Sequence, residues 1–138
     1  MQENKYRTVL IVDDNEIDNI ITKKYLQGAE FAENIIIKLS AMEGLRYLSD
    51  ISNDEDIPDI IFLDIRMPEM DGFEFLEEYD ESINDRIKNK TKIIMLTSSL
   101  DYNDITKAMN NKYVRKFLVK PLKREELGKI REFLDIPS

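Results

Sequence analysis

Five polar residues could carry out chemistry in this chain of 138 residues, and each lies at the end of a short apolar run: Asp13, Asp14, Asp64, Thr97 and Lys120. The chain contains no cysteine and no histidine. Thiol chemistry, imidazole acid–base catalysis and zinc sites built from Cys or His are therefore excluded. The reactive groups that remain are carboxylates, hydroxyls, amines and the backbone.

The carboxylates of Asp13, Asp14 and Asp64 would need a cation if the fold brought them together. Two like charges about 4 Å apart repel by about 4 kcal/mol at an effective dielectric constant of about 20. A ligand set made only of oxygen atoms favours a hard divalent ion, Mg2+ first and Mn2+ or Ca2+ after it. A carboxylate beside such an ion can act as a nucleophile and form an aspartyl phosphate. A Lys ammonium and a Thr hydroxyl can bind the other phosphoryl oxygens.

The elements that must position these residues are apolar runs that alternate with amphipathic stretches. Short, β-branched apolar runs are typical of strands buried on both faces. The polar segment 80–92 either continues the helix before it or forms an exposed loop. We expect strands over residues 8–12, 35–39, 60–63, 93–96 and 116–119, helices that begin at the capping residues Asn15, Ser40 and Asp71, and further helices over about 101–110 and 122–134.

Five strands in strict alternation with helices predict an α/β fold, a doubly wound five-stranded parallel sheet with helices on both faces. The carboxyl ends of parallel strands share one edge of the sheet, and the reactive crevice of open α/β sheets lies there. The five polar residues should therefore converge on one rim. Helical spacing predicts core-facing stripes at Ile17, Ile20, Ile21 and Tyr25 in the first helix, Phe73, Leu76 and Tyr79 in the third, and Leu127, Ile130 and Leu134 in the last.

Length and composition limit the class of protein. We expect residues 1–138 to form a single domain, with a core over about 7–134 and no effector domain. The chain is 42% apolar and 35% charged, a balance typical of globular proteins. No apolar run approaches the roughly 18 residues of a membrane span, and the first residues do not resemble a secretory signal, so we expect a cytoplasmic protein. The net charge of −8 opposes binding to nucleic-acid phosphates.

Four stretches of the chain carry a family resemblance, and they occur in order along nearly its whole length, from about Thr8 to Leu134. Together they resemble the receiver domain of two-component response regulators, in which the sheet has the flavodoxin-like strand order 2-1-3-4-5. The stretches are Val-Leu-Ile-Val-Asp-Asp-Asn at 9–15, Phe-Leu-Asp-Ile-Arg-Met-Pro-Glu-Met-Asp-Gly at 62–72, Ile-Met-Leu-Thr-Ser at 94–98 and Phe-Leu-Val-Lys-Pro-Leu at 117–122.

The resemblance implies a role for each residue of the rim. It makes Asp64 the phosphoacceptor in a Mg2+-dependent reaction. The metal ligands would be Asp13, Asp14, Asp64 and the backbone carbonyl of Arg66. The phosphodonor would be a sensor histidine kinase or a histidine phosphotransfer protein. The chain would be no enzyme beyond its own phosphorylation and dephosphorylation at Asp64.

The resemblance also implies a conformational switch. Thr97 and Lys120 would contact the phosphoryl group, and Phe117 occupies the position of the aromatic switch residue. The Lys120–Pro121 peptide is usually cis in this family. Pro68 and Gly72 would shape the loop over the site, with Gly72 supplying backbone freedom. A downstream target protein would bind the face formed by residues around 101–110, 116–120 and 122–134.

We also predict that Arg66 and Ser99, two residues beyond Asp64 and Thr97, influence the lifetime of the phosphoryl group by flanking the approach of water.

Three other classes of protein share parts of this sequence pattern of strand-end polar residues. A degenerate receiver that acts as a phosphorylation-independent interaction module should lack at least one of Asp14, Asp64, Thr97 and Lys120, and none is missing. A phosphatase of the haloacid-dehalogenase type needs a second Asp two residues after its nucleophile, where this chain has Arg66. A flavodoxin-like FMN binder needs a phosphate loop after the first strand, where two Asp residues would repel the phosphate.

Overall fold

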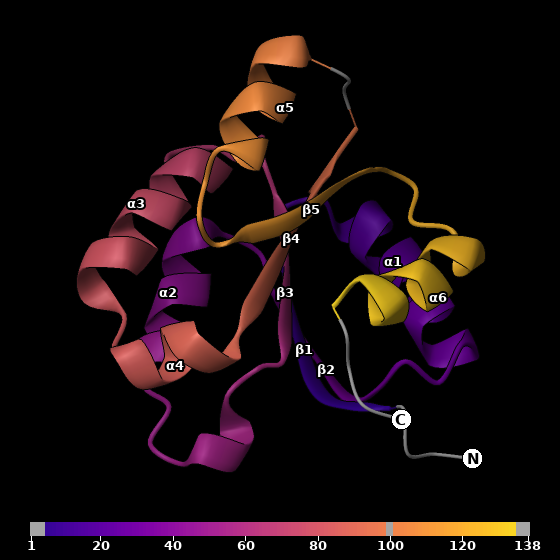
Figure 1. Cartoon of the computed structure of the whole chain (residues 1–138), viewed down its shortest axis with the longest axis horizontal. Coiled ribbons are helices and arrows are strands. Elements are labelled where there is room, and N and C mark those ends of the chain that lie inside the picture. The colour runs from indigo at the N-terminus through magenta and orange to yellow at the C-terminus, as the bar shows by residue number, and fades with distance from the viewer. Residues whose placement is uncertain (1–4, 99–100, 135–138) are drawn as a thin grey trace.

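The computed structural model describes residues 5–98 and 101–134, and a parallel five-stranded sheet runs through it. The strand order is β2-β1-β3-β4-β5, so the predicted fold class and strand order are confirmed. Figure 1 shows the sheet edge-on between two groups of helices. The strands are β1 (Tyr6–Val12), β2 (Ala32–Lys38), β3 (Ile60–Asp64), β4 (Lys92–Thr97) and β5 (Val114–Val119).

Helices cover both faces of the sheet, as predicted (Figure 1). On one face lie α1 (Glu16–Gly28) and α6 (Arg124–Phe133). The opposite face carries α2 (Ala41–Ser49), α3 (Gly72–Ser82) and α4 (Asp85–Lys90), and α5 (Tyr102–Met109) lies beside β5. A short 3-10 turn occupies Asp54–Asp56. Within the described ranges, no helix is both long and apolar enough to cross a membrane.

Each face of the sheet has its own apolar core, because successive side chains of a strand point to opposite sides. In β1, Leu10 and Val12 belong to the core under α2 and α3, whereas Val9 and Ile11 belong to the core under α1 and α6. All four are at most 1% exposed. This two-sided burial explains why the strand is a continuous apolar run rather than an alternating one.

The segment 80–92, for which the sequence left a longer helix or a loop open, forms a helix of its own. α3 ends at Ser82, and Asn84 then begins α4 by accepting a hydrogen bond from the Ile87 N–H at 3.0 Å. Ile87 is fully buried against the core on that side. The buried Ile87 side chain and the Asn84 cap thus hold α4 against the domain. The segment is therefore neither a continuation of α3 nor an exposed loop.

The predicted inner face of α1 is wrong. Ile17 is 70% exposed and Ile20 56% exposed, and Ile21 and Tyr25 are also open to solvent. The buried positions of the helix are Asn19, Thr22 and Leu26. These residues have the same helical spacing as the apolar stripe, so periodicity alone selected the wrong face. The polar side chain of Asn19 is tolerated inside because its Nδ2 donates to the Asp13 carbonyl at 2.9 Å.

The other predicted helix faces are largely confirmed. Leu127, Ile130 and Leu134 are buried between α6 and the sheet. In α3, Leu76 and Tyr79 are buried, whereas Phe73 is only partly covered and the fully buried ring is that of Phe75.

Two substitutions in α1 test the corrected assignment. Leu26→Ala removes a side chain that is 0% exposed and should lower the free energy of unfolding by about 2–5 kcal/mol. Ile17→Ser lies on the exposed stripe, and we expect a change within about 0.5 kcal/mol. Urea unfolding followed by circular dichroism measures both. If Ile17→Ser lowered the free energy of unfolding as much as Leu26→Ala, the stripe that is exposed here would have to be packed in solution.

Candidate functional site

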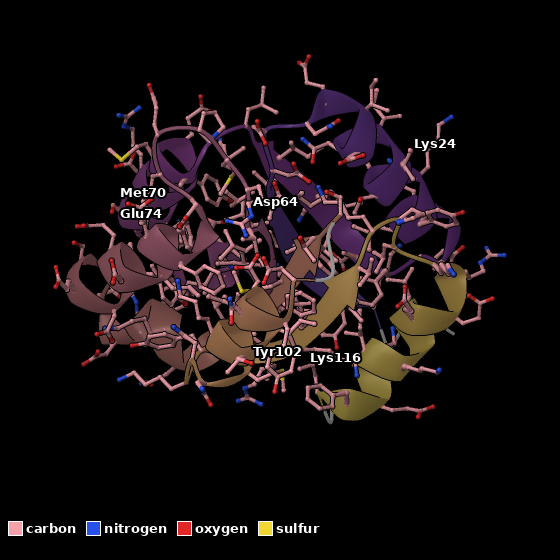
Figure 2. The ribbon with its side chains drawn as sticks, turned by 90° about the horizontal axis from the view of Figure 1, so that it is seen from above. Lys24, Asp64, Met70, Glu74, Tyr102 and Lys116 are labelled. Carbon is pink, nitrogen blue, oxygen red and sulfur yellow. The ribbon has the colours of Figure 1, made fainter. Side chains whose placement is uncertain are left out.

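The strand register brings the two buried aspartates to the same level of the sheet. Val12 at the end of β1 pairs with Leu63 in β3. The next residues along the two strands, Asp13 and Asp64, therefore lie side by side at the carboxyl edge. Figure 2, viewed from above that edge, shows Asp64 near the middle of the molecule, between the α1 side and the α3 side.

The other strands bring their polar residues to the same rim. Asp64 pairs with Leu96, so Thr97 lies one residue further along β4. Thr97 pairs with Val119, and the backbone N–H of Lys120 donates to the Thr97 carbonyl at 2.7 Å. The predicted convergence of the five polar residues at one edge is thus what the register produces.

Three carboxylates form a cluster at this rim. One oxygen from each of Asp13, Asp14 and Asp64 lies within 4.8 Å of the others. Asp13 and Asp64 are buried and Asp14 is exposed. Oδ1 of Asp13 accepts the Asn15 N–H at 3.0 Å, which helps to fix the orientation of that carboxylate. A donor set of oxygens with one solvent-facing side suits a hydrated Mg2+ ion, which keeps several of its waters.

Lys120 lies inside this cluster. Its Nζ is 2.6 Å from Oδ2 of Asp13 and 3.2 Å from Oδ1 of Asp64. The Lys120 side chain is 8% exposed, and the peptide bond to Pro121 is cis, as the family resemblance implied. One ammonium among the three clustered carboxylates leaves two negative charges uncompensated. The cluster therefore carries a net negative charge, and a divalent ion would neutralise it.

The protonation equilibria follow from this burial and charge. Burial, reinforced by the charge of Asp13 and opposed by Lys120, raises the pKa of Asp64 to about 6. Burial acts to lower the pKa of Lys120, but hydrogen bonds to Asp13 and Asp18 and the charge of Asp64 outweigh it and raise that pKa. Lys120 is thus a fixed positive charge at neutral pH, and Asp64 is ionised there against the cost of burial.

The predicted switch residues lie where the register requires. Thr97 is 1% exposed at the end of β4. Phe117 pairs with Met95, two residues before the Thr97 level, and packs partly buried against the core under α2 and α3. Ser98, which follows Thr97, is exposed and lines a pocket of about 300 Å3 together with Lys120.

Arg66 has a partner that the sequence did not indicate. Its guanidinium donates to the carboxylate of Asp104 in α5, and this Asp104 side chain is 8% exposed. The loop after β3 is thereby tied to α5, and the influence of Arg66 on the lifetime of the phosphoryl group stays a prediction. Its backbone carbonyl remains a predicted metal ligand, and Ser99 lies outside the described residues.

The loop between β3 and α3 uses its glycine for close approach rather than for an unusual backbone angle. A Cβ on Gly72 would lie 2.6 Å from the Asp64 carbonyl oxygen. The left-handed residue of the loop is Glu69, with φ of 72°. Asp71 then begins α3 through a capping box with Glu74, as predicted. Gly72 therefore lets the N-terminus of α3 pack directly against the strand that carries Asp64.

Sequence reasoning missed three residues of this region: Asp18, Asn19 and Asp104. Oδ2 of Asp18, in the first turn of α1, is 2.9 Å from the Lys120 Nζ. Asn19 and Asp104 are polar residues on the buried sides of their helices. Because buried polar residues need partners, they could have been found only if the buried side of each helix had been known.

The raised pKa of Asp64 predicts a pH-dependent gain in stability for Asp64→Asn. Folding raises the pKa from 3.8 to about 6, so the folded protein holds this proton more tightly than the unfolded chain. The resulting stabilisation is complete below pH 3.8 and is lost as the pH rises through 6. At about pH 7.5 in EDTA, Asp64→Asn should raise the free energy of unfolding by about 1–3 kcal/mol.

That gain should shrink towards zero near pH 4. Glu77→Gln removes an exposed carboxylate of α3 and serves as the control, with little change at either pH. Urea unfolding across the pH range gives the curves. A gain that is the same at acidic and neutral pH would contradict the assignment of a strained, ionised Asp64.

Comparison with known proteins gives one consistent result. A family model described as the response regulator receiver domain matches residues 9–131. In sequence, the chain is 34% identical over 122 residues to a hybrid signal transduction histidine kinase L of Dictyostelium discoideum, covering 88% of this chain and 7% of that protein. It is 33% identical over 122 residues to the sensor histidine kinase CheAY of Helicobacter pylori, covering 86% of this chain and 14% of that protein. The chain thus spans only a small part of these two relatives.

Solved structures agree with the sequence comparisons. A two component response regulator from Cytophaga hutchinsonii has a TM-score of 0.87 and 28% identity, with 96% of this chain and 99% of that chain covered. A response regulator receiver protein from Dyadobacter fermentans has a TM-score of 0.81 and 28% identity, with the same coverage of each chain. With the family model matching most of its length, the chain belongs to the response regulator receiver domain family.

Proposed function

We propose that this receiver accepts a phosphoryl group on Asp64 from a phosphohistidine, in a Mg2+-dependent reaction, and passes the change to a partner protein. The observation that carries the proposal is the rim itself. The Asp64 carboxylate lies 3.2 Å from a buried ammonium and within 4.8 Å of two further carboxylates. A nucleophile, an anion-binding cation and a metal ligand set are the three parts that phosphoryl transfer to a carboxylate requires.

The chemical step balances with groups that this chain and a phosphohistidine supply. A carboxylate oxygen of Asp64 forms a bond to phosphorus as the phosphorus–nitrogen bond of the donor breaks. The electron pair of that bond stays on the imidazole nitrogen, and a donor ring that is protonated on its other nitrogen leaves as neutral imidazole. In this proposal the Lys120 ammonium and the Thr97 hydroxyl bind phosphoryl oxygens. The 3.2 Å contact of Lys120 with Asp64 and the position of Thr97 at the end of β4 support these roles.

Asp13, Asp14 and Asp64 would hold the Mg2+ ion, with the Arg66 carbonyl as a further proposed ligand. The ion would supply positive charge against the developing charge on the phosphoryl oxygens. The cluster fits this role because Lys120 compensates only part of its charge. Asp13 is held in place by the Asn15 N–H at 3.0 Å, so the site is oriented before any ion binds.

The phosphodonor we propose is a sensor histidine kinase or a histidine phosphotransfer protein, acting in the cytoplasm where ATP-dependent kinases generate phosphohistidine. Two of the relatives are named histidine kinases. The exposed stripe of α1, which includes Ile17 and Ile20, lies next to the rim and offers apolar surface to an approaching protein. A nucleic-acid partner is not part of the proposal, since the net charge is −8.

The output surface we propose is the face of α5, β5 and α6. Movement of the Thr97 hydroxyl towards a phosphoryl oxygen would open space that the Phe117 ring can enter. Exposed apolar groups on this side are Tyr102, at 80% exposed, and Phe133, at 50% exposed. Figure 2 shows Tyr102 on the same side of the molecule as Lys116 of β5. A tenfold change in partner affinity needs only about 1.4 kcal/mol of coupling.

A degenerate receiver that binds partners without phosphorylation is the alternative that a phosphorylation assay must exclude. The two other readings have less support. Arg66 occupies the position where a haloacid-dehalogenase-type phosphatase needs its acid, and its side chain pairs with Asp104. The Asp13–Asp14 pair borders the site where an FMN phosphate would have to bind.

Phosphorylation of Asp64 can be tested directly. Incubation with acetyl phosphate and Mg2+ should add one phosphoryl group, seen by intact mass as a base-labile adduct. Asp64→Asn should abolish the adduct, EDTA should abolish it, and Glu77→Gln should leave it unchanged. Uptake that persists in Asp64→Asn, or that is equal in EDTA, would contradict the proposal.

The same samples test the switch. With beryllofluoride and Mg2+ bound, the methyl signals of Ile105 and Val119 should shift, because Val119 pairs with Thr97 and Ile105 belongs to α5, which contacts β5. Unchanged methyl signals at full occupancy of Asp64 would rule out this route of output.

A further inference from the structure

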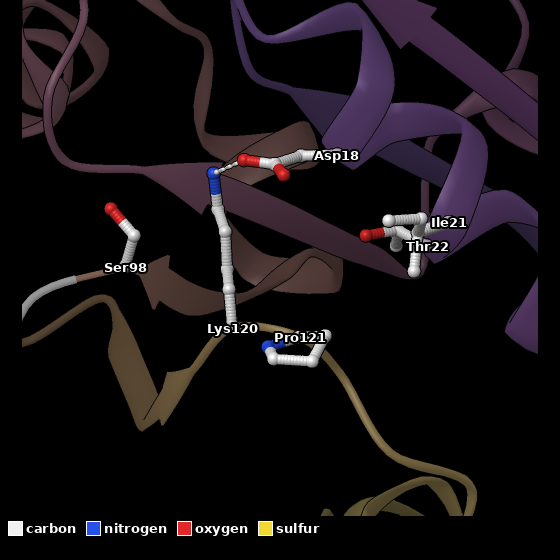
Figure 3. Close-up of a pocket in the computed structure, with 6 residues that line it drawn as sticks. All are labelled: Asp18, Ile21, Thr22, Ser98, Lys120 and Pro121. Carbon is white, nitrogen blue, oxygen red and sulfur yellow. Dashed lines mark hydrogen bonds and ion pairs between the residues drawn. The ribbon is translucent and has the colours of Figure 1, made fainter.

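A fourth carboxylate reaches the rim from outside the three-aspartate cluster. Asp18 lies in the first turn of α1, where its backbone N–H is held by the Asn15 side chain at 2.9 Å. Its Oδ2 accepts from the Lys120 Nζ at 2.9 Å, a closer contact than the one between Lys120 and Asp64. Figure 3 shows the Lys120 side chain extending from the Pro121 side of the pocket to meet Asp18.

The ammonium of Lys120 is shared among three carboxylates. A Lys side chain has three N–H donors. The Nζ donates a hydrogen bond to Oδ2 of Asp18 at 2.9 Å, and it forms ion pairs with Asp13 at 2.6 Å and Asp64 at 3.2 Å. A phosphoryl oxygen on Asp64 that accepts a hydrogen bond from this ammonium would compete with Asp18 for it.

Asp18 is the contact that costs least to release. The side chains of Asp13 and Asp64 are 4% and 7% exposed, so either one would remain buried without its cation. The Asp18 side chain is 30% exposed. It also lines the pocket of about 300 Å3 that includes Ser98 and Lys120, where water can solvate a released carboxylate.

We propose that Asp18 is a positioning residue that retains Lys120 in the unphosphorylated protein and releases it when Asp64 carries a phosphoryl group. Asp18 then sets the balance between the two states by competing with the phosphoryl oxygens for the ammonium. This inference rests on the proposed phosphorylation of Asp64. The Asp18–Lys120 pair differs from an ordinary surface ion pair in one respect, because its loss should favour the phosphorylated form.

Three variants of α1 separate this role from general electrostatics. Asp18→Asn removes the competing charge with nearly the same shape. Glu16→Gln removes an exposed negative charge from the same helical turn and is the matched control. Asp18→Glu restores the charge on a longer side chain. Beryllofluoride is the probe, titrated into each protein at saturating Mg2+ and followed by calorimetry.

We expect Asp18→Asn to lower the apparent dissociation constant for beryllofluoride about three- to fivefold, as suits a partly exposed ion pair. Glu16→Gln and Asp18→Glu should stay within about twofold of the wild type. A second readout, made at the same saturating Mg2+, follows the Lys120 ammonium by 15N NMR. Its signal in unphosphorylated Asp18→Asn should shift towards the position seen in beryllofluoride-bound wild type, whereas Glu16→Gln should leave it unchanged.

The outcomes distinguish this inference from the function on which it rests. Wild type that binds beryllofluoride, together with Asp18→Asn that binds equally or more weakly, overturns the role of Asp18 alone. An equal gain of beryllofluoride affinity in Asp18→Asn and Glu16→Gln also overturns the role of Asp18, because the gain would then come from the change in overall charge. Wild type that fails to bind beryllofluoride at Asp64 overturns both proposals.

Discussion

The interaction on which the rest of the rim depends is the buried ammonium of Lys120 among the carboxylates of the strand ends. It lies 2.6 Å from Asp13 and 3.2 Å from Asp64, two buried carboxylates whose negative charge it partly compensates. One positive charge cannot balance three clustered carboxylates. Burial, with the charge of Asp13 added to it, raises the pKa of Asp64 to about 6. The residual negative charge of the cluster suits the divalent ion that we propose for phosphoryl transfer.

The pairing of the strands holds these carboxylates and the ammonium at one edge of the sheet. Parallel pairing of β1, β3 and β4 fixes Asp13 and Asp64 at one level and Thr97 one residue beyond the partner of Asp64. Burial of both sheet faces makes a slip of one residue costly, because it would turn every core side chain of a strand to the wrong face. The close packing of Gly72 on the Asp64 carbonyl ties α3 to the same edge. The polar residues of the rim thus lie at the ends of the strands, and helices flank the sheet that carries them.

The features that depend on neighbouring residues in the sequence, such as strand ends and helix caps, could be predicted. Strand-end residues such as Asp64 follow from apolar runs, and the caps at Asn15 and Asp71 follow from short-range patterns. The buried side of α1 could not be predicted, because Asn19 lies inside and Ile17 outside, and only tertiary contacts decide between two stripes of equal period. The contacts of Asp18 and Asp104 with distant basic residues were missed for the same reason.

The most direct test of the charge shortage is the affinity of Lys120→Gln for Mg2+, measured by calorimetry beside the wild type. Removing the ammonium leaves three clustered carboxylates without a cation. We predict that the variant binds Mg2+ about three- to tenfold more tightly, while it loses affinity for beryllofluoride. Mg2+ binding that is unchanged or weaker in a folded Lys120→Gln protein would contradict the central role given to this ammonium.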